Sequence, residues 1–454
     1  MKRSTIRMTV DEPNDAIIKE IIKQHTASKN ITLGLYQRYD QEGVPIQSRT
    51  FKDALKPNNK LSHDYRGYVI NQVVGYLWGN PISYQINKVR YGENEYEAYD
   101  DALEDFNTLN VIDDLDSELG KLASICGYAS RLVYIDTDGV ERVMNISPWE
   151  AVFIESKNKT THAVRYYTEK YYEGKEEKER TLVEWYDSTN VSFYVKSEKS
   201  GNSFVLDDEG VKPHLFDHVP LILFQNNDEE RGDFEKVEML IDAYDKNRSD
   251  STNEVETFAN AYMAFKGVTI DSETINEMKQ TGGIEIDENG DVFFITKNIN
   301  DTFVENTRKN LNEDIHKFSA SVDMNDEKFS GASQSGESRK WKLIELENKA
   351  GTKARKFGVG LREQFKVLCS AWSKKGIALN YLDVFWEFKR NLPIDLLYIG
   401  ESISKLKGLH SDQTLLGLIP YIDDIEYEQQ LMEQEKSAYI DLDNLPPDEK
   451  KEVN

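Results

Sequence analysis

The 454-residue sequence has only two cysteines, a shortage of positive charge and no long apolar run. Cys126 and Cys369 are far apart, which excludes a disulfide framework and favours a reducing compartment. No segment approaches the roughly 20 consecutive apolar residues of a membrane helix. The first residues also lack the apolar core of a secretory signal. We therefore expect a soluble protein that is made inside a cell.

Acidic residues outnumber basic ones by 81 to 56, which gives a formal net charge of −25. Tight nucleic-acid binding depends on basic side chains that neutralise phosphates. The charge balance therefore argues against a protein that sequesters DNA or RNA. It leaves open a protein that lets nucleic acid pass without holding it.

The motifs of common catalytic and metal sites are also missing. No G-x-x-x-x-G-K-[ST] phosphate loop is present, which excludes a motor ATPase of that class. His214 and His218 in "HLFDH" lie four residues apart but lack the glutamate of a zinc-protease motif. The segment "DENGD" lacks the glycine and distal glutamate positions of a calcium-binding loop. We expect a protein without catalysis, cofactor or metal.

The stretch "YVINQVVGYLWGNPISYQI", residues 68–86, is mostly apolar but contains a stop signal. Large side chains over 65–78 recur at helical spacing. Gly-Asn-Pro at 79–81 then supplies a permissive residue and a proline that cannot continue the helix. Apolar residues alternate over 82–86, as in a half-buried strand. The stretch predicts a helix, a tight stop and a strand.

Helices and strands separate along the first half of the chain. Amphipathic helices are predicted over 14–26, 95–109 and 113–126. From residue 128 the apolar period changes to two, which predicts a β-rich region to about residue 224. A hairpin turn is expected at Asp138-Gly139. The polar insert 173–180 is expected to be a solvated loop or hairpin tip.

Long helices dominate the second half of the chain. Residues 235–266 contain neither proline nor glycine and predict one long helix. Its middle, 245–253, is polar on every face, so we expect it to border solvent or a neighbouring subunit. A small α/β module over 267–300 follows, with a hairpin about Asn289-Gly290. A second helix is predicted over 301–322, with a capping box at its start.

The remaining chain combines a loop, a third long helix and a helical end. Residues 323–338 are rich in serine and glycine and predict a flexible loop. The third helix, over about 338–375, is expected to be kinked at its glycines, Gly351, Gly358 and Gly360. "LDVFWEFKR" predicts one strand that returns to the β-rich region. Helices follow, one of them capped by Ser411, before a disordered tail.

Five segments and their order are distinctive. They are "YVINQVVGYLWGNPISY", "GYASRLVYIDTDG…ISPWEAVFI", "LIDAYDKNRSDSTNEVETFANAYM", "SGESRKWKLIELENKA" and "IPYIDDIEYEQQ". Together they resemble the portal proteins of tailed bacteriophages, in particular those of phages of Gram-positive bacteria. The resemblance covers about residues 30–440. It implies an α+β, mainly helical fold with an α/β wing, a long-helix stem, a small α/β clip and a helical crown.

The resemblance also implies how the chain is divided. The wing would be 1–234 and 338–396, the stem helices 235–266 and 301–322, the clip 267–300, the tunnel loop 323–337, and the crown with a flexible tail 397–454. Copies of the chain would close into a ring, a dodecamer, at one capsid vertex of the virion. Double-stranded DNA would pass through its tunnel during packaging and ejection.

The expected partners follow from the same resemblance. They are further copies of the chain, the terminase large subunit, the head-completion adaptor, and the scaffolding and major capsid proteins. The terminase and the adaptor would dock on the clip, and the capsid proteins would surround the wing. The chain would be made in the host cell cytoplasm, and no membrane would be involved.

Candidate site residues lie in three segments. The tunnel loop offers soft, transient DNA contacts through Asn325, Lys328, Ser333, Gln334 and Ser335, unless it is merely a solvated loop. The start of the basic helix 338–366 offers Arg339, Lys340 and Lys342. For that helix, pairing with acidic neighbouring subunits is favoured over contact with DNA. The clip hairpin offers docking contacts through Glu285, Asp287 and Asn289.

Two other functions stay open on the residues alone. One is a monomeric or dimeric nucleic-acid-processing enzyme with a helical arm. The other is a helical adaptor or another structural protein of the phage head. The size of the oligomer separates either of these from a closed ring.

Overall fold

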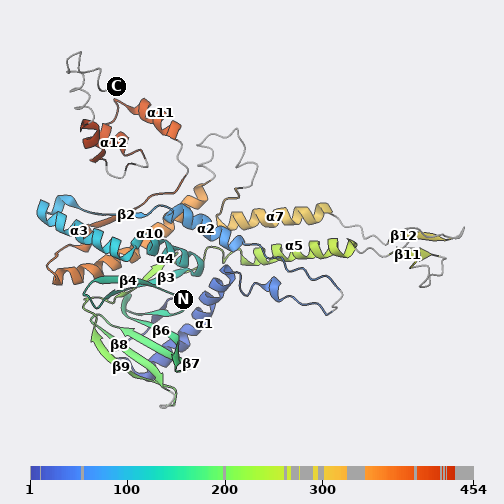
Figure 1. Ribbon diagram of the computed structural model, residues 1–454, viewed down its shortest axis with the longest axis horizontal. Coiled ribbons are helices and arrows are strands. Elements are labelled where there is room, and N and C mark those ends of the chain that lie inside the picture. The colour runs from blue at the N-terminus through green and yellow to red at the C-terminus, as the bar shows by residue number, and fades with distance from the viewer. Residues whose placement is uncertain are drawn as a thin grey trace. The chain divides into compact units, whose positions relative to one another are not determined.

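Figure 1 shows the computed structural model of the chain. The described residues are 2–10, 12–52, 56–197, 201–259, 263–266, 276, 290–294, 301–324, 343–392, 396–419, 422, 425 and 427–434. The chain divides into two compact units, Met1–Asn391 and Leu392–Asn454. Helices contain more of the described residues than strands do, which confirms the predicted α+β, mainly helical class. Within the described residues, no helix is both long enough and apolar enough to span a bilayer.

The largest sheet contains most of the predicted β-rich region. In spatial order it consists of β1 (Thr5–Arg7), β5 (Ala151–Ser156), β6 (Lys159–Glu173), β7 (Glu176–Tyr186), β8 (Asn190–Ser197) and β9 (Ser203–Pro213). β1 runs parallel to β5, and all other neighbours are antiparallel. The insert 173–180 forms the exposed end of the β6–β7 hairpin, as predicted.

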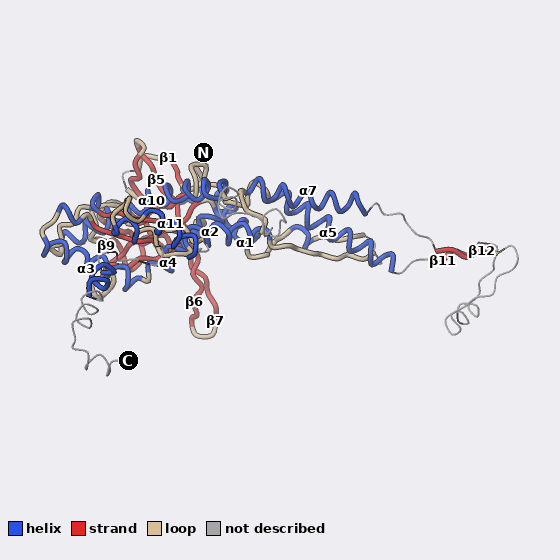
Figure 2. Tube along the Cα trace, turned by 90° about the horizontal axis from the view of Figure 1, so that it is seen from above, coloured by secondary structure: helices blue, strands red, loops and turns tan. Residues whose placement is uncertain are grey.

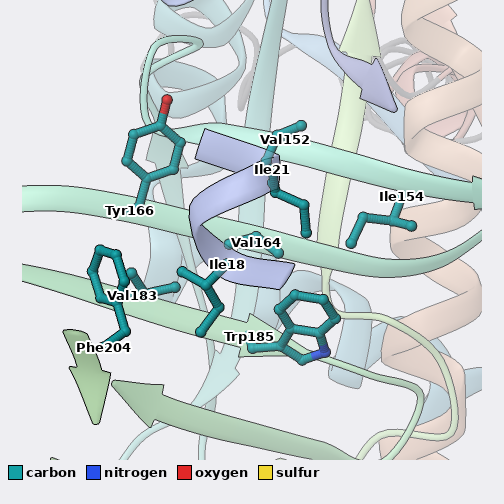
Figure 3. Packing of buried hydrophobic residues seen from close by; sticks show 9 residues of the cluster. All are labelled: Ile18, Ile21, Val152, Ile154, Val164, Tyr166, Val183, Trp185 and Phe204. Carbon is teal, nitrogen blue, oxygen red and sulfur yellow. The ribbon is translucent and has the colours of Figure 1, made fainter. Parts of the chain in front are cut away.

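Helix α1 (Asp15–Tyr39) packs against this sheet. It begins where the sequence predicted and runs well beyond residue 26. Asn14 caps it, because its side-chain oxygen accepts a hydrogen bond from the Ile17 backbone N–H at 3.0 Å. Ile18 and Ile21 are fully buried and face Trp185 and its neighbours on the sheet (Figure 3). Their apolar contact with the sheet fixes the helix on it.

His25 extends the buried face of α1 but is polar. Its Nδ1 lies 2.8 Å from the Tyr166 hydroxyl, and its Nε2 lies 3.4 Å from the Tyr128 hydroxyl. Burial lowers the pKa of His25 to about 4, and the nearby Lys29 ammonium contributes in the same direction. A charged imidazolium at this position would lose its hydration without gaining a counterion.

We expect this histidine to make the fold sensitive to acid. Its pKa is lower in the folded chain than in the unfolded chain, so the unfolded chain binds the extra proton first as the pH falls. Stability present above about pH 6.5 is therefore lost towards pH 4, with about 2 kcal/mol lost by pH 5. Urea unfolding at pH 7 and pH 5 measures this loss. His25→Gln should show a smaller loss than the parent, whereas substituting the exposed His410 in the same way should leave the loss unchanged.

A second, antiparallel sheet is surrounded by helices. Its order is β10 (Leu221–Gln225), β3 (Tyr128–Ile135) and β4 (Glu141–Ile146). The predicted turn at Asp138-Gly139 joins β3 to β4. Helices α3 (Glu93–Asn110), α4 (Ile112–Cys126) and α10 (Ile344–Lys374) pack on this sheet, and α2 (Tyr65–Trp78) packs on α4 and α10. The prediction of a helix over 65–78 is confirmed at both ends.

Two glycines of α10 allow large aromatic side chains to approach the helix. A Cβ atom at Gly360 would lie 2.4 Å from Phe224 Cδ1, and one at Gly358 would lie 3.0 Å from Trp386 Nε1. Helix α10 continues without interruption through both glycines. The contacts therefore give these glycines a packing role, which the predicted kink did not include.

The predicted strand near residue 385 is present, but its partner differs from the prediction. β13 (Val384–Phe388) pairs antiparallel with β2 (Ile82–Ile86), the strand that follows α2. It does not return to the large sheet, because its ladder hydrogen bonds go to β2. Short 3₁₀ helices occur at Pro45–Ser48, Lys88–Arg90 and Tyr381–Asp383.

Two helices, α5 (Glu238–Ala259) and α7 (Asp301–Ser319), lie side by side in both views (Figures 1 and 2). The prediction of one helix over 235–266 is wrong at its end, because Met263–Lys266 forms strand β11. β11 pairs antiparallel with β12 (Asp291–Phe294). Phe265 lies opposite Val292, so a pairing distant in sequence prevails over the helical spacing of the local aromatic residues.

The second unit is helical in its described part. It contains α11 (Leu396–Leu406) and α12 (Asp412–Leu416), and residues 427–434 are also helical. Ser411 caps α12 as predicted, because its hydroxyl accepts a hydrogen bond from the Thr414 backbone N–H at 3.3 Å.

Candidate functional site

All candidate site residues predicted from the sequence lie outside the described residues. These are Asn325, Lys328, Ser333, Gln334, Ser335, Arg339, Lys340, Lys342, Glu285, Asp287 and Asn289. The structure does describe the elements that lead into and out of the predicted tunnel loop, α7 and α10. The described residues that contact these two elements therefore form the surroundings of the candidate site.

The polar middle of α5 contacts an extended segment of the same chain, residues 56–63. Asp245 Oδ1 accepts a hydrogen bond from the His63 backbone N–H at 2.9 Å, and Ser249 Oγ accepts one from the Leu61 backbone N–H at 2.9 Å. Both acceptor side chains are fully buried. The expectation that the whole polar middle borders solvent or another subunit is therefore wrong for this face.

A sequence signal for this contact existed. Asp245, Ser249 and Asn253 recur every four residues, so they form one polar stripe along α5. Asn253 Oδ1 accepts the Asn59 backbone N–H at 2.7 Å, which continues the same pattern. Short polar side chains at this spacing can satisfy the backbone of an extended segment, which has no partner strand of its own.

The chain after α7 is held by helix α2. Gln72 makes two hydrogen bonds to the backbone of Val322: its Nε2 donates to the carbonyl at 2.8 Å, and its Oε1 accepts from the N–H at 2.6 Å. The Tyr68 hydroxyl also donates to the Val322 carbonyl, at 2.7 Å. The sequence analysis predicted the 65–78 helix without these contacts, although Tyr68 and Gln72 share one face at a spacing of four.

The basic residues in the described part of α10 have partners within the chain. Lys353 Nζ lies 2.7 Å from Asp233 Oδ2, and Lys356 Nζ lies 2.9 Å from Asp228 Oδ1. Arg362 donates to the Val384 carbonyl at 3.0 Å. The favoured expectation of pairing between subunits is wrong for Lys353, because it is buried against Asp233 of the same chain. For the other basic residues it stays a prediction.

A buried ionic cluster connects α10, α4 and the chain before α5. Lys353 Nζ donates to Ser124 Oγ at 2.6 Å and to Asn226 Oδ1. Burial lowers the pKa of Lys353 to about 8, although Asp233 acts in the opposite direction. Burial also opposes ionisation of Asp233, but Lys349 and Lys353 together hold its pKa below the usual value. The cluster is therefore an ion pair whose partners depend on each other.

Lys349 links this cluster to the end of α7. Its Nζ lies 3.5 Å from Asp233 Oδ1 and donates to the Ser319 carbonyl at 2.8 Å. Ser319 is the last residue of α7, so its carbonyl has no partner within the helix. One lysine thereby joins the chain before α5, the end of α7 and the start of α10.

Large apolar side chains stay exposed on the α5–α7 helix pair. Met239 and Val255 on α5 are 82% and 68% exposed, and Phe303 and Phe318 on α7 are 67% and 56% exposed. An isolated helix pair would gain stability by burying such side chains, which favours contact of these helices with another protein.

Comparison with known proteins decides between the functions left open by the sequence. The family described as phage portal protein, SPP1 Gp6-like, matches residues 18–441. The chain belongs to this family of phage portal proteins. The resemblance and the function inferred from the sequence are thereby confirmed. This is a family of structural proteins of the phage, which fits the lack of catalytic motifs.

Two relatives of the portal protein match it over almost their whole length. The portal protein of Bacillus phage SPP1 is 24% identical over 473 aligned residues, which cover 97% of this chain and 90% of the relative. The portal protein of Clostridium phage phiCD119 is 23% identical over 419 residues, which cover 87% of this chain and 89% of the relative.

Proposed function

We propose that this portal protein closes into a ring of twelve copies at one vertex of the phage capsid. Double-stranded DNA passes through the ring during packaging and ejection. The match of the portal family to residues 18–441 carries this proposal. A closed ring arises from a heterologous interface whose rotation returns to its starting point.

The proposed ring divides each chain into five parts. The wing is 1–234 and 338–396, the stem 235–266 and 301–322, the clip 267–300, the tunnel loop 323–337, and the crown and tail 397–454. The described helices α5 and α7 lie within the stem, and their exposed apolar side chains support contact with neighbouring copies. Strand β11 forms the last residues of the first proposed stem segment, Met263–Lys266.

The proposed channel passes DNA because its wall does not grip the phosphates. Twelve copies of a chain with charge −25 carry about −300 in total, which repels a polyanion. Each phosphate that a protein neutralises adds affinity through counterion release, so few basic contacts allow sliding. In this proposal the polar tunnel loop supplies only transient contacts, through Lys328 and its polar neighbours.

The proposed ring also serves as a docking platform without catalytic activity. The terminase large subunit and later the head-completion adaptor dock on the clip, near Glu285, Asp287 and Asn289. The scaffolding and major capsid proteins surround the wing. The family assignment supports these partners as components of the phage head and its packaging apparatus.

Native mass measurement and electron microscopy of the purified chain test the ring. Twelve copies of a 52.4 kDa chain give about 630 kDa. We expect a particle of this mass with an axial opening. A monomer or dimer at every concentration and in every buffer would contradict the ring. Nuclease activity that survives stringent purification would instead favour a nucleic-acid-processing enzyme.

A further inference from the structure

One flank of helix α2 carries four polar or amphipathic side chains in a row. Tyr65, Tyr68, Gln72 and Tyr76 are spaced by three, four and four residues, so they lie along a single stripe. The rest of the helix is anchored in the protein interior through Val69, Ile70, Val73 and Leu77. The stripe is therefore presented by a helix whose own position is fixed by apolar packing.

The first three residues of this stripe, Tyr65, Tyr68 and Gln72, bind α7 and the residues that follow it. The Tyr65 hydroxyl donates to Asn312 Oδ1 at 2.6 Å, within α7 itself. Gln72 satisfies both backbone groups of Val322, as a neighbouring strand would. The Met324 backbone N–H donates to the Tyr68 hydroxyl at 3.3 Å. A glutamine side chain suits this task because its amide is both a donor and an acceptor.

The last residue of the stripe, Tyr76, binds the start of α10. The Tyr76 hydroxyl donates to Glu347 Oε2 at 2.6 Å. Arg390 binds the same carboxylate with two nitrogens, Nε and Nη2, each at 2.9 Å. These hydrogen bonds, that of Arg390 above all, hold the pKa of Glu347 below its usual value. Glu347 lies in the first turn of α10, so this contact fixes the helix start.

We propose that α2 positions the tunnel loop by holding the chain on both sides of it, with Gln72 and Tyr76 as positioning residues. We call this arrangement the mount. The proposed tunnel loop, 323–337, lies between Val322 and Glu347 in the sequence, and both of these residues are bound to the same helix. Gln72 and Tyr76 are four residues apart, about 6 Å along the helix axis. The residues that bind the two flanks of the loop are thus about one helical turn apart on a single helix. This proposal rests on the proposed function, in which that segment faces the DNA.

The mount has a physical consequence for DNA passage. Contacts with one helix on both sides of the loop fix the two described flanks, Val322 and Glu347, relative to each other. Removing one contact frees that flank without changing the sequence of the loop. The polar contacts of α2 therefore set where the loop stands, while the apolar side of α2 keeps the wing folded.

Two variants of the full-length chain test the mount. Gln72→Leu removes both hydrogen bonds to Val322 and keeps the side chain large. Tyr68→Phe combined with Tyr76→Phe removes only the two hydroxyl groups. Asn71→Leu is the matched control, since Asn71 is exposed on the same helix. We expect all three proteins to assemble with the parental mass and to melt within a few degrees of the parent.

Hydrogen exchange in the assembled protein is the first measurement. We expect Gln72→Leu to raise exchange at the Val322 amide about tenfold, since the hydrogen bond that protects it is gone. The double tyrosine variant should raise exchange at Met324. Asn71→Leu should match the parent at both amides. Unchanged exchange at Val322 in Gln72→Leu would overturn the mount, whatever the protein does with DNA.

Packaging of DNA by phage that carry each variant is the second measurement. We expect Gln72→Leu to fill fewer heads or to retain less DNA than Asn71→Leu. Normal packaging by Gln72→Leu, when deletion of 326–335 impairs packaging, would overturn the positioning role alone. Normal packaging by the deletion itself would overturn the proposed function of the loop, and the exchange result would still decide whether α2 holds its ends.

Discussion

Replacing Asp233 with alanine is expected to destabilise the fold by about 3–5 kcal/mol, because it leaves the Lys353 ammonium buried without its counterion. Lys353 would keep hydrogen bonds to Ser124 and Asn226, but neither partner carries a charge. The lysine can lower the penalty only by giving up its proton. Urea unfolding followed by tryptophan fluorescence measures the change, with all variants compared in the same oligomeric state.

An ion pair with an exposed aspartate, Asp228–Lys356, provides the matched control for this prediction. Asp228→Ala removes the partner of Lys356, but Asp228 is solvated, so we expect little measurable change. Adding Lys353→Met to Asp233→Ala should recover part of the lost stability, because no charge then remains buried. Raising the pH from 7 to 9 should also recover part of it in Asp233→Ala, since an unpaired buried lysine deprotonates more easily there. Equal effects of Asp233→Ala and Asp228→Ala would contradict the buried ion pair.

Deleting residues 326–335 is expected to leave the ring intact and to remove most DNA-filled heads. Val322 and Glu347, which lie on either side of the proposed tunnel loop in the sequence, keep their contacts with α2, so assembly and stability should be preserved. The ring would lose the segment that we propose to stand closest to the DNA. Native mass measurement checks the ring, and the DNA content of heads from complemented phage checks packaging and retention.

A Gly/Ser linker of equal length separates the presence of the loop from its chemistry. If the linker packages DNA as poorly as the deletion does, Lys328 and its polar neighbours carry the function. If the linker restores packaging, the length of the loop matters and those side chains do not. Normal packaging by the deletion would remove the tunnel loop from the mechanism altogether.

Local patterns predicted the elements whose signals lie within a few residues. The helix over 65–78 is ended by the Gly-Asn-Pro stop, and the Asp138-Gly139 turn joins two strands as expected. Ser411 caps its helix because a serine hydroxyl needs only the backbone N–H three residues later. Such features depend on the chain's own neighbours, so the sequence is sufficient to find them.

Pairings between segments far apart in the sequence were harder to predict. Phe265 follows Phe258 and Tyr262 at a helical spacing, yet residues 263–266 form β11 because β12 offers a partner strand. The strand β13 was predicted correctly, but its partner β2 lies about 300 residues earlier, and no local signal identifies it. The same reason explains why the α2 contacts to Val322 and Glu347 were missed: each joins residues about 250 or more apart.

By itself, the amino-acid sequence determined the order of helices and strands, the acidic balance and the portal family, because periodicity, charge and motif order are properties of the chain as written. Only the tertiary structure decided which polar residues are already satisfied. It buried Asp245 and Ser249 of the polar α5 stripe and paired the lysines of α10 with acids in the same chain. The reason is physical: the sequence can show a polar stripe but does not identify its partner, because folding alone brings donor and acceptor to about 3 Å.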